Sequence, residues 1–278
     1  MPLPTVPQSF FWADTPSGPV LKCRPLERIT PHLFTTRQLP LSSAGDWRRA
    51  GALLGATRHV TLNQVHGRDV ITVRRGVALP PDRQDADALV SNDPDVAIAV
   101  RAADCVPLLI ADSKTGAVAA VHAGWRGTAA GAATAALEAL TREFGSRPDE
   151  VTVAIGPSIG PCCYEVGSEL VDAFAAAGHA RHLVDRWFRV GNRGSGIRDR
   201  APGGRERGRL SLDVAGANRD QLILAGVPEQ NIYDCGLCTA MHLDVLTSYR
   251  AEREEAGRIA GVIRARPDPG EGGRPPRP

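Results

Sequence analysis

Three short apolar runs, residues 96–99, 107–110 and 117–121, constrain the fold of this chain more than any other feature. Continuous apolar runs of this length, separated by Gly, Pro and polar residues, are typical of buried β-strands. The first two runs flank the polar segment 101–105, and the third stops at His122. Because α/β proteins build their sites at strand ends along a common edge of a sheet, we expect the side chains at these breaks to lie close together.

Three residues whose side chains bind soft metal ions stand at such breaks: His66, Cys105 and His122. Two imidazoles and one thiolate suit Zn²⁺, and three protein ligands leave the open fourth position that a catalytic zinc needs. The ligands are separated by 39 and 17 residues, so the fold rather than a short finger-like motif must bring them together. The alternative for each residue alone is a hydrogen-bonded core histidine or a small buried cysteine. The three together favour the metal site.

The remaining pattern predicts strands and helices that alternate only loosely. We expect strands at 32–36, 59–62, 70–73, 88–91, 151–155, 187–190, 231–233 and 259–263, and helices at 129–144, 166–177 and 212–225. Residues 39–51 are predicted to form a loop with a candidate helix start at Asp46, and 70–73 to be the return partner of 59–62. This order favours a single α/β (α+β) domain, with mixed β-sheets flanked by helices, over a doubly wound parallel sheet.

Five stretches carry a family resemblance: 63–67, 103–108, 121–127, 155–166 and 238–250. The most specific are Val-His-Ala-Gly-Trp-Arg-Gly-Thr from residue 121 and Gly-Pro-Ser-Ile-Gly-Pro-Cys-Cys-Tyr-Glu-Val from residue 156. They resemble the YfiH family, also called the laccase-domain or multicopper polyphenol oxidoreductase family, and the match covers most of the chain. The resemblance implies a YfiH-like layered sandwich. Carried over by position, the family's zinc ligands fall on His66, Cys105 and His122.

The resemblance also implies an activity. Members are described as zinc-dependent purine nucleoside enzymes, which implies adenosine and inosine phosphorolysis and adenosine deamination, with a nucleoside and phosphate as the small-molecule ligands. Arg37 and Arg250 match family motif positions and are predicted to hold phosphate together with Arg126, which opens a helix. The alternative for Arg126 is a solvated surface side chain. Cys163 is predicted to border the substrate pocket.

Catalysis is assigned to Asp104, Cys105 and His122. Asp104 lies next to Cys105 and could orient a histidine ligand or act as a general base, and the alternative is that it caps a turn. Glu165 and Asp234 are weaker acid–base candidates.

The chain departs from the family pattern on both sides of a Ser-Tyr-Arg motif that ends at Arg250. Members usually carry two Phe before this motif, and a second Arg followed by Asp-Gly after it. Here residues 246–247 are Leu-Thr and residues 251–254 are Ala-Glu-Arg-Glu. The expected substrate site therefore has less aromatic stacking surface and one Arg fewer, whereas the metal ligands are unaffected.

Three other functions stay open at this point. A metal-free hydrolase that edits peptidoglycan precursors could use Cys105 as nucleophile and His122 as base, but His66 then has no role. A copper-dependent polyphenol oxidase would combine the His₂Cys set with an axial Met, yet the chain has only two Met and seven His, so Cu²⁺ is less favoured than Zn²⁺. A non-enzymatic binding role is the third.

The six cysteines are too few and too irregular for a disulfide scaffold and fit reduced thiols in the cytoplasm. Cys235 and Cys238 have C-x-x-C spacing, but a second such pair is absent, and we expect them to pack or to line the edge of the site. Cys162 and Cys163 are adjacent in a Gly-Pro loop, where a disulfide between them would be strained. Both rank below Cys105 as metal ligands.

Charge and composition set the outer limits. The net charge is +2, and the Gly/Pro-rich segments 193–209 and 264–278 carry +4 and +2, which leaves the rest of the chain near −4. We expect a disordered segment 1–8, one catalytic domain over 9–263 with a flexible insert at 193–209, and a disordered tail over 264–278. A basic face with interleaved aromatics, an apolar run of ~18 residues and a signal peptide are all missing, which argues against nucleic-acid binding, membrane insertion and secretion. A cytoplasmic monomer or weak homodimer is expected.

Overall fold

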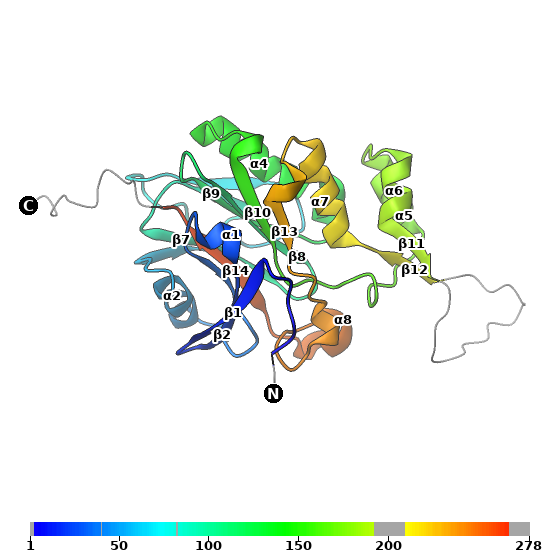
Figure 1. Ribbon diagram of the computed structural model, residues 1–278, viewed down its shortest axis with the longest axis horizontal. Coiled ribbons are helices and arrows are strands. Elements are labelled where there is room, and N and C mark those ends of the chain that lie inside the picture. The colour runs from blue at the N-terminus through cyan, green and yellow to red at the C-terminus, as the bar shows by residue number, and fades with distance from the viewer. Residues whose placement is uncertain (1–2, 40, 82, 192–208, 267–278) are drawn as a thin grey trace, which may run out of the picture.

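The computed structural model describes residues 3–39, 41–81, 83–191 and 209–266, and two six-stranded mixed sheets form its centre (Figure 1). The first sheet has the order β1-β2-β3-β14-β7-β4, and the second has the order β13-β10-β8-β9-β6-β5. The strands of the first sheet are β1 (Phe10–Thr15), β2 (Gly18–Cys23), β3 (His32–Phe34), β14 (Ile259–Arg264), β7 (Val96–Ala102) and β4 (Arg58–Val60). Those of the second are β13 (Ile232–Asp234), β10 (Val151–Ile155), β8 (Val106–Asp112), β9 (Val118–Ala123), β6 (Ala88–Ser91) and β5 (Val70–Val73). The predicted α/β class with mixed sheets is confirmed.

The apolar runs that constrain the fold are strands buried on both faces. Along β8, Leu109 and Ala111 belong to the core between the two sheets, whereas Leu108 and Ile110 belong to the core beneath the helices. The same alternation continues on β9, which pairs antiparallel with β8. Because successive side chains of a strand point to opposite faces, a run without polar residues requires a covering layer on each side.

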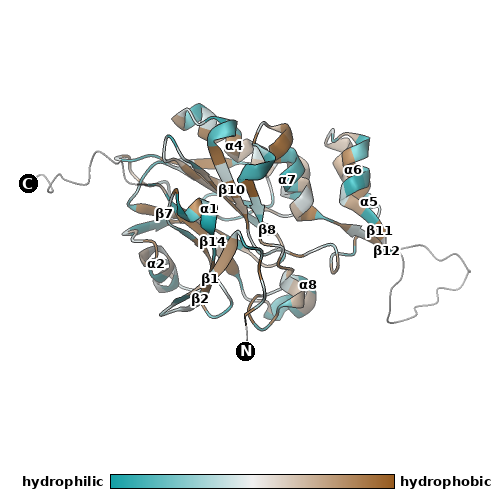
Figure 2. Cartoon of the chain, in the orientation of Figure 1, coloured by the Kyte–Doolittle hydropathy of each residue, from teal (hydrophilic) through white to brown (hydrophobic). Residues whose placement is uncertain are grey.

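Helices supply the outer layers. α4 (Ala132–Phe144) and α7 (Val214–Leu224) pack on the second sheet, and α2 (Ala44–Ala52) covers the outer face of the first sheet with Trp47 and Ala50. The other helices are α1 (Arg24–Glu27), α3 (Trp125–Ala130), α5 (Glu169–Ala176), α6 (Arg181–Trp187) and α8 (Tyr249–Glu252). Figure 2 shows hydrophilic residues on the peripheral helices and apolar residues along the central strands. The result is the layered sandwich that the family resemblance implies.

Helix α2 begins two residues earlier than the predicted start at Asp46. Ser43 is its N-cap, and the Ser43 hydroxyl accepts a hydrogen bond of 3.2 Å from the backbone N–H of Asp46. The Asp46 carboxylate in turn accepts a bond of 2.8 Å from the backbone N–H of Ser43. This reciprocal capping box satisfies two N–H groups that the first helical turn leaves without partners.

Several elements differ from the sequence prediction. β5 pairs with β6 in the second sheet and is not the return partner of β4, which lies in the first sheet. The helix predicted over 129–144 begins at Trp125 and is interrupted at Gly131, whose φ of 79° is left-handed. The hairpin of β1 and β2, helix α6 and the two-stranded sheet of β11 (Phe188–Gly191) and β12 (Arg209–Leu212) were not predicted in full.

The segments predicted to be disordered or flexible lie partly outside the described residues. Most of 193–209 and 264–278 is not described, apart from the strand residues that begin β12 and end β14 and the two residues after β14. Segment 1–8 is described from residue 3, and there Leu3 and Val6 pack against the core between the sheets. In addition, Trp12 Nε1 donates a hydrogen bond of 2.8 Å to the Pro4 carbonyl, so these residues have fixed contacts. Within the described part of the chain, no helix has the length and apolarity of a membrane span.

Candidate metal centre

The three predicted ligands come together at one end of the space between the sheets. Cys105 lies where the chain crosses from β7 in the first sheet to β8 in the second, and His66 lies on the crossing from β4 to β5. His122 is on β9, and the register of β8 with β9 pairs it with Pro107, two residues beyond Cys105. The ligands therefore sit at crossings between two sheets rather than at a common edge of one sheet.

Their geometry fits a three-ligand metal centre. The ligand atoms of His66, Cys105 and His122 all lie within 4.8 Å of one another, and the two imidazole centroids are 4.9 Å apart at 76°. His122 is buried and His66 is exposed, so the cluster has a protein side and a solvent side. A Cβ on Gly124 would stand 2.8 Å from the Cys105 Sγ and 3.0 Å from the His66 Cδ2, so only glycine leaves the centre free.

A buried carboxylate that the sequence did not indicate holds the centre in place. Asp87 precedes β6, and its Oδ1 accepts a hydrogen bond of 2.8 Å from the His122 Nδ1, which leaves the Nε2 available for a metal. The same carboxylate accepts backbone N–H bonds of 2.9 Å from His66 and 2.6 Å from Gly67. One side chain thus orients two of the three ligands, which is the usual role of a carboxylate behind a metal-bound histidine. The only sequence signal is an acid directly before a buried strand.

These contacts also set the protonation of the ligands. Burial alone would raise the pKa of Cys105, but hydrogen bonds with His122 and His66 outweigh it and lower that pKa to about 6. Burial would lower the pKa of His122, but hydrogen bonds with Asp87 and Cys105 raise it to about 9. Burial opposes ionisation of Asp87 too, yet the bonds from His122 and Gly67 keep its pKa below the usual range. Cys105 is therefore a thiolate near neutral pH, the form that binds metals.

A cavity of about 630 Å³ opens beside the ligands, and arginines dominate its polar lining. The five arginines that line it are Arg101, Arg126, Arg250, Arg253 and Arg258. Asp104 is the only carboxylate among the described lining residues, and none of the five arginines forms an ion pair with a described carboxylate. Five guanidinium groups without an ion-pair partner among the described carboxylates give the cavity a positive lining, which favours an anion.

Aromatic rings contact two of the five arginines, and burial affects a third. The Arg126 guanidinium lies 4.3 Å from the centroid of the Trp125 ring, and that of Arg250 lies 5.2 Å from the Tyr164 ring. Burial and repulsion from Arg83 and Arg258 lower the pKa of Arg101. An anion in the cavity would offset this repulsion between positive charges, so the arrangement favours anion binding.

Some of the predicted site residues line the cavity and others do not. Arg126 and Arg250, which were predicted to hold phosphate, line the cavity, whereas the sequence did not single out Arg101, Arg253 and Arg258. Arg253, which belongs to the altered stretch 251–254, also lines the cavity.

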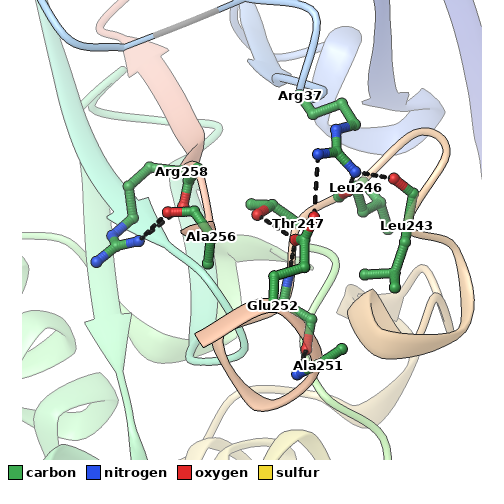
Figure 3. Close-up of polar contacts among 10 residues, drawn as sticks. Arg37, Leu243, Leu246, Thr247, Ala251, Glu252, Ala256 and Arg258 are labelled. Atoms are coloured by element: carbon green, nitrogen blue, oxygen red, sulfur yellow. Dashed lines mark hydrogen bonds and ion pairs between the residues drawn. The ribbon is translucent and has the colours of Figure 1, made fainter. Parts of the chain in front are cut away.

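Arg37 does not line the cavity. Its guanidinium donates to the carbonyl groups of Leu243 and Leu246 and forms an ion pair of 3.0 Å with Glu252 (Figure 3). Glu252 also accepts hydrogen bonds from Thr247 and from the backbone N–H of Ser248. Arg37 therefore holds the segment that leads into α8 in place.

Asp104 lines the cavity but does not orient His122, which is the role of Asp87. Its carboxylate accepts a bond of 2.6 Å from the Thr239 hydroxyl and one of 2.6 Å from the backbone N–H of Arg250. Asp104 has a φ of 87°, and His66 has a φ of 63°. Positive φ values are unfavourable for residues other than glycine, and they cluster here at the site.

The remaining candidates lie outside the cavity. Cys163 gathers instead with Cys162 and Cys238 in a second cluster of ligand atoms that lie within 4.8 Å of one another. Glu165 forms an ion pair of 3.1 Å with Arg209. Asp234 caps a turn by accepting a hydrogen bond from the backbone N–H of Gly236, and burial raises its pKa.

Comparison with known proteins places this chain among relatives of known description. Residues 42–266 match the family described as multi-copper polyphenol oxidoreductase laccase. A purine nucleoside phosphorylase of Deinococcus radiodurans is 33% identical over 89% of this chain and 93% of its own length. The adenosine deaminase RL5 of an unknown prokaryotic organism is 36% identical over 72% of this chain and 73% of its own. Among solved structures, YlmD from Geobacillus stearothermophilus superposes with a TM-score of 0.71 at 29% identity and covers 89% of this chain and 96% of that one. The matched range 42–266 includes the three ligands and the five arginines.

Proposed function

The chain belongs to the multi-copper polyphenol oxidoreductase laccase family, and we propose that it is a zinc-dependent purine nucleoside phosphorylase. One observation carries this proposal: the His66, Cys105 and His122 cluster opens into a cavity lined by five arginines that lack carboxylate partners. A metal centre with an open position beside an anion site is what phosphorolysis needs, because phosphate is the nucleophile. The names of the relatives point to the same reaction class.

The donor set fits Zn²⁺. The centre has two imidazoles and one thiolate, an Asp87 carboxylate that accepts a hydrogen bond from the His122 imidazole, and free space above Gly124. A blue-copper centre would add an axial Met, but the described Met241 is 63% exposed and does not line the cavity. When bound, Zn²⁺ would supply a Lewis acid at the cavity wall.

The arginines bind and orient the phosphate. Arg126 and Arg250, steadied by their aromatic rings, offer forked N–H donors that match phosphate oxygens. An oxygen of hydrogen phosphate held in this way attacks C1′ of the ribose, and the bond from C1′ to the base nitrogen breaks with its electron pair on the base. The proton that the hydrogen phosphate gives up passes, directly or through water, to that base nitrogen. Ribose 1-phosphate and the free base are the products. The cavity volume lies within the ordinary range for small-molecule sites.

Asp104 is assigned as a positioning group and proton acceptor. Both of its carboxylate oxygens accept hydrogen bonds, from Thr239 and from the backbone of Arg250, so it holds Arg250 at the cavity wall. A carboxylate fixed as an acceptor is a poor donor for the leaving base. The same acceptor suits adenosine deamination, in which water displaces the C6 amino group as ammonia, and a relative named as an adenosine deaminase favours this as a second activity.

A second candidate, a metal-free cysteine hydrolase, is favoured by one observation. The pKa of Cys105 is lowered to about 6 and that of His122 is raised to about 9, the pattern of a thiolate–imidazolium pair. His66 and the arginines have no evident role in such an enzyme, so we rank it below the phosphorylase.

The two candidates separate in one experiment. Purified protein is incubated with adenosine or inosine, with and without phosphate, before and after removal of metal by a strong chelator, and products are resolved by chromatography. We expect free base and ribose 1-phosphate only when phosphate and metal are both present. His122→Ala should lower kcat/KM at least about 100-fold, because it removes a ligand of the charge-stabilising centre. Cys235→Ala, a buried cysteine outside the centre, serves as the matched control.

The other outcomes are equally clear. Inosine and ammonia formed from adenosine without phosphate would identify deamination as the main activity. Activity that survives the chelator but is abolished by thiol alkylation would replace the phosphorylase with the hydrolase. Stoichiometric zinc with no turnover of any nucleoside would reject both nucleoside activities.

A further inference from the structure

Three cysteines outside the cavity form a second cluster. Cys162 and Cys163 end a Gly-Pro loop, and Cys238 comes from the segment after β13. Their sulfur atoms all lie within 4.8 Å of one another, and all three side chains are free thiols. Cys162 is exposed, Cys163 is half-buried and Cys238 is buried, so the cluster is reachable from solvent on one side. None of the three lines the cavity of the first centre.

The spacing of the sulfurs suits a single ion. A metal–sulfur bond is about 2.3 Å, so three thiolates around one ion stand about 3.8–4.0 Å apart in tetrahedral or trigonal geometry. The sulfur atoms lie at most 4.8 Å apart, so no pair has to close by more than about 1 Å to reach the distance that a bound ion requires. Side-chain rotation of the exposed Cys162 can close this difference without moving the backbone.

The backbone already holds the two segments together. Ser158 and Cys238 form a parallel bridge, in which the Ser158 N–H donates to the Leu237 carbonyl and the Thr239 N–H donates to the Ser158 carbonyl. The Gly160 N–H donates a hydrogen bond of 3.3 Å to the Cys238 Sγ. Backbone N–H groups directed at sulfur are typical of the surroundings of metal-bound thiolates, where they orient the ligand. The ligands are thus preorganised before any ion arrives.

The cluster contradicts the simplest interpretation of the C-x-x-C spacing. That spacing pairs Cys235 with Cys238, but Cys235 is 1% exposed and is not part of the cluster. Burial raises its pKa far above the ordinary range, as expected of a cysteine that packs in the core. The partners of Cys238 come instead from a loop about 75 residues earlier in the chain.

We propose that Cys162, Cys163 and Cys238 form a second metal site that binds a soft d10 cation, Cu⁺ or Zn²⁺, through sulfur alone. Thiolate ligands select such ions over Mg²⁺ and Ca²⁺.

Cadmium titration tests the proposal, because Cd²⁺ stands in for soft d10 ions and its thiolate complexes absorb in the ultraviolet. Reduced, metal-free protein is titrated without oxygen, and bound metal is counted by elemental analysis after gel filtration. We expect two equivalents, one at each centre. The equivalent at the three-sulfur cluster should contribute about three times the charge-transfer absorbance of the one-sulfur centre, in proportion to the thiolates bound.

Variants assign the second equivalent. The Cys162→Ser variant should lose the second equivalent of Cd²⁺ and keep the first. Because Cys162 is exposed, this substitution does not disturb the core. Cys238→Ser should do the same, with thermal unfolding as the check that it folds. Cys235→Ser is the matched control and should keep both equivalents. Titration of the unchanged protein with Cu⁺ and with Zn²⁺ then identifies which ion binds more tightly.

Two results would overturn the proposal. Wild-type protein that binds one equivalent, with the absorbance of a single thiolate, has no second site. A second equivalent that survives Cys162→Ser but is lost in Cys235→Ser would belong to the C-x-x-C pair and not to this cluster.

Discussion

The two ligand clusters of this protein each offer three ligand atoms, but the pKa values of their cysteines shift in opposite directions. In each, three ligand atoms lie within 4.8 Å of one another. Yet the pKa of Cys105 is lowered to about 6, whereas that of Cys163 is raised to about 12. Burial raises the pKa of both thiols, and the neighbours decide the outcome. Two imidazoles donate to Cys105, while Cys163 has only other thiols beside it.

The difference shows that the number of ligands does not determine their protonation state before a metal binds. At the first centre the protein itself stabilises the thiolate, through a chain of hydrogen bonds from Asp87 to His122 to Cys105. An entering ion has to displace a proton from His122 at the first centre, whose pKa is about 9, and from Cys163 at the three-sulfur cluster, whose pKa is about 12, so binding should weaken as the pH falls at both sites and more strongly at the second. We therefore infer that the first centre suits an ion that stays bound beside the cavity, and that the three-sulfur cluster suits an ion whose occupancy follows conditions such as pH.

The largest expected contrast is in thiol reactivity. In reduced, metal-free protein at pH 7, iodoacetamide should alkylate Cys105 about 100-fold faster than Cys163. The thiolate fractions differ by about 10⁵, and the lower intrinsic nucleophilicity of a low-pKa thiolate recovers about 10³ of this. The rate at Cys105 should fall as the pH drops through about 6 and level off above pH 7, while the rate at Cys163 keeps rising. Peptide mass spectrometry over a time course measures both.

Zinc provides the control for this experiment. One equivalent of Zn²⁺ should protect Cys105, because a metal-bound thiolate is no longer free to attack. Equal alkylation rates for the two cysteines in metal-free protein would remove the electrostatic difference on which the comparison is based.

The second contrast concerns the two acids near the first centre. Asp87→Asn should weaken zinc binding about 10- to 100-fold, because the amide cannot accept the bonds from His122, His66 and Gly67 together. Asp104→Asn should change zinc affinity by less than about threefold, because its carboxylate contacts Thr239 and the backbone of Arg250 instead of a ligand. Competition with a chromophoric chelator measures both affinities, and thermal unfolding checks that each variant folds. A larger loss in Asp104→Asn would make it the orienting acid.

Much of the fold followed from local patterns. The strands predicted at 88–91 and 151–155 match β6 and β10, because an apolar run between turn residues is a self-contained signal. The predicted pairing of 70–73 with 59–62 was wrong, because the sheet that a strand joins depends on segments far away in the chain. The start of α2 was missed by two residues because Ser43, not Asp46, is the cap.

The site divides in the same way. The three ligands were predicted because imidazole and thiolate side chains are rare enough to carry meaning, and the structure brings them together. Asp87 was missed because carboxylates are common and only burial against His122 distinguishes this one. Arg37, which was predicted to hold phosphate, contacts carbonyl groups and Glu252 and does not line the cavity, because a motif match does not reveal which way a guanidinium faces. Arg101, Arg253 and Arg258 converge only in three dimensions.

The smallest contrast compares two glycines, one at each cluster. A Cβ on Gly124 would lie 2.8 Å from the Cys105 Sγ, closer than real Cβ contacts allow, so Gly124→Ala should displace the thiolate and weaken zinc binding about tenfold. A Cβ on Gly160 would lie 3.3 Å from the Cys162 Sγ, and because Cys162 is exposed its side chain can move aside. Gly160→Ala should therefore weaken cadmium binding at the three-sulfur cluster by about threefold or less. Both changes are read in the titrations above. If Gly160→Ala were the more damaging, the three-sulfur cluster would be the more rigid of the two, and its assignment as a site whose occupancy follows conditions would have to be given up.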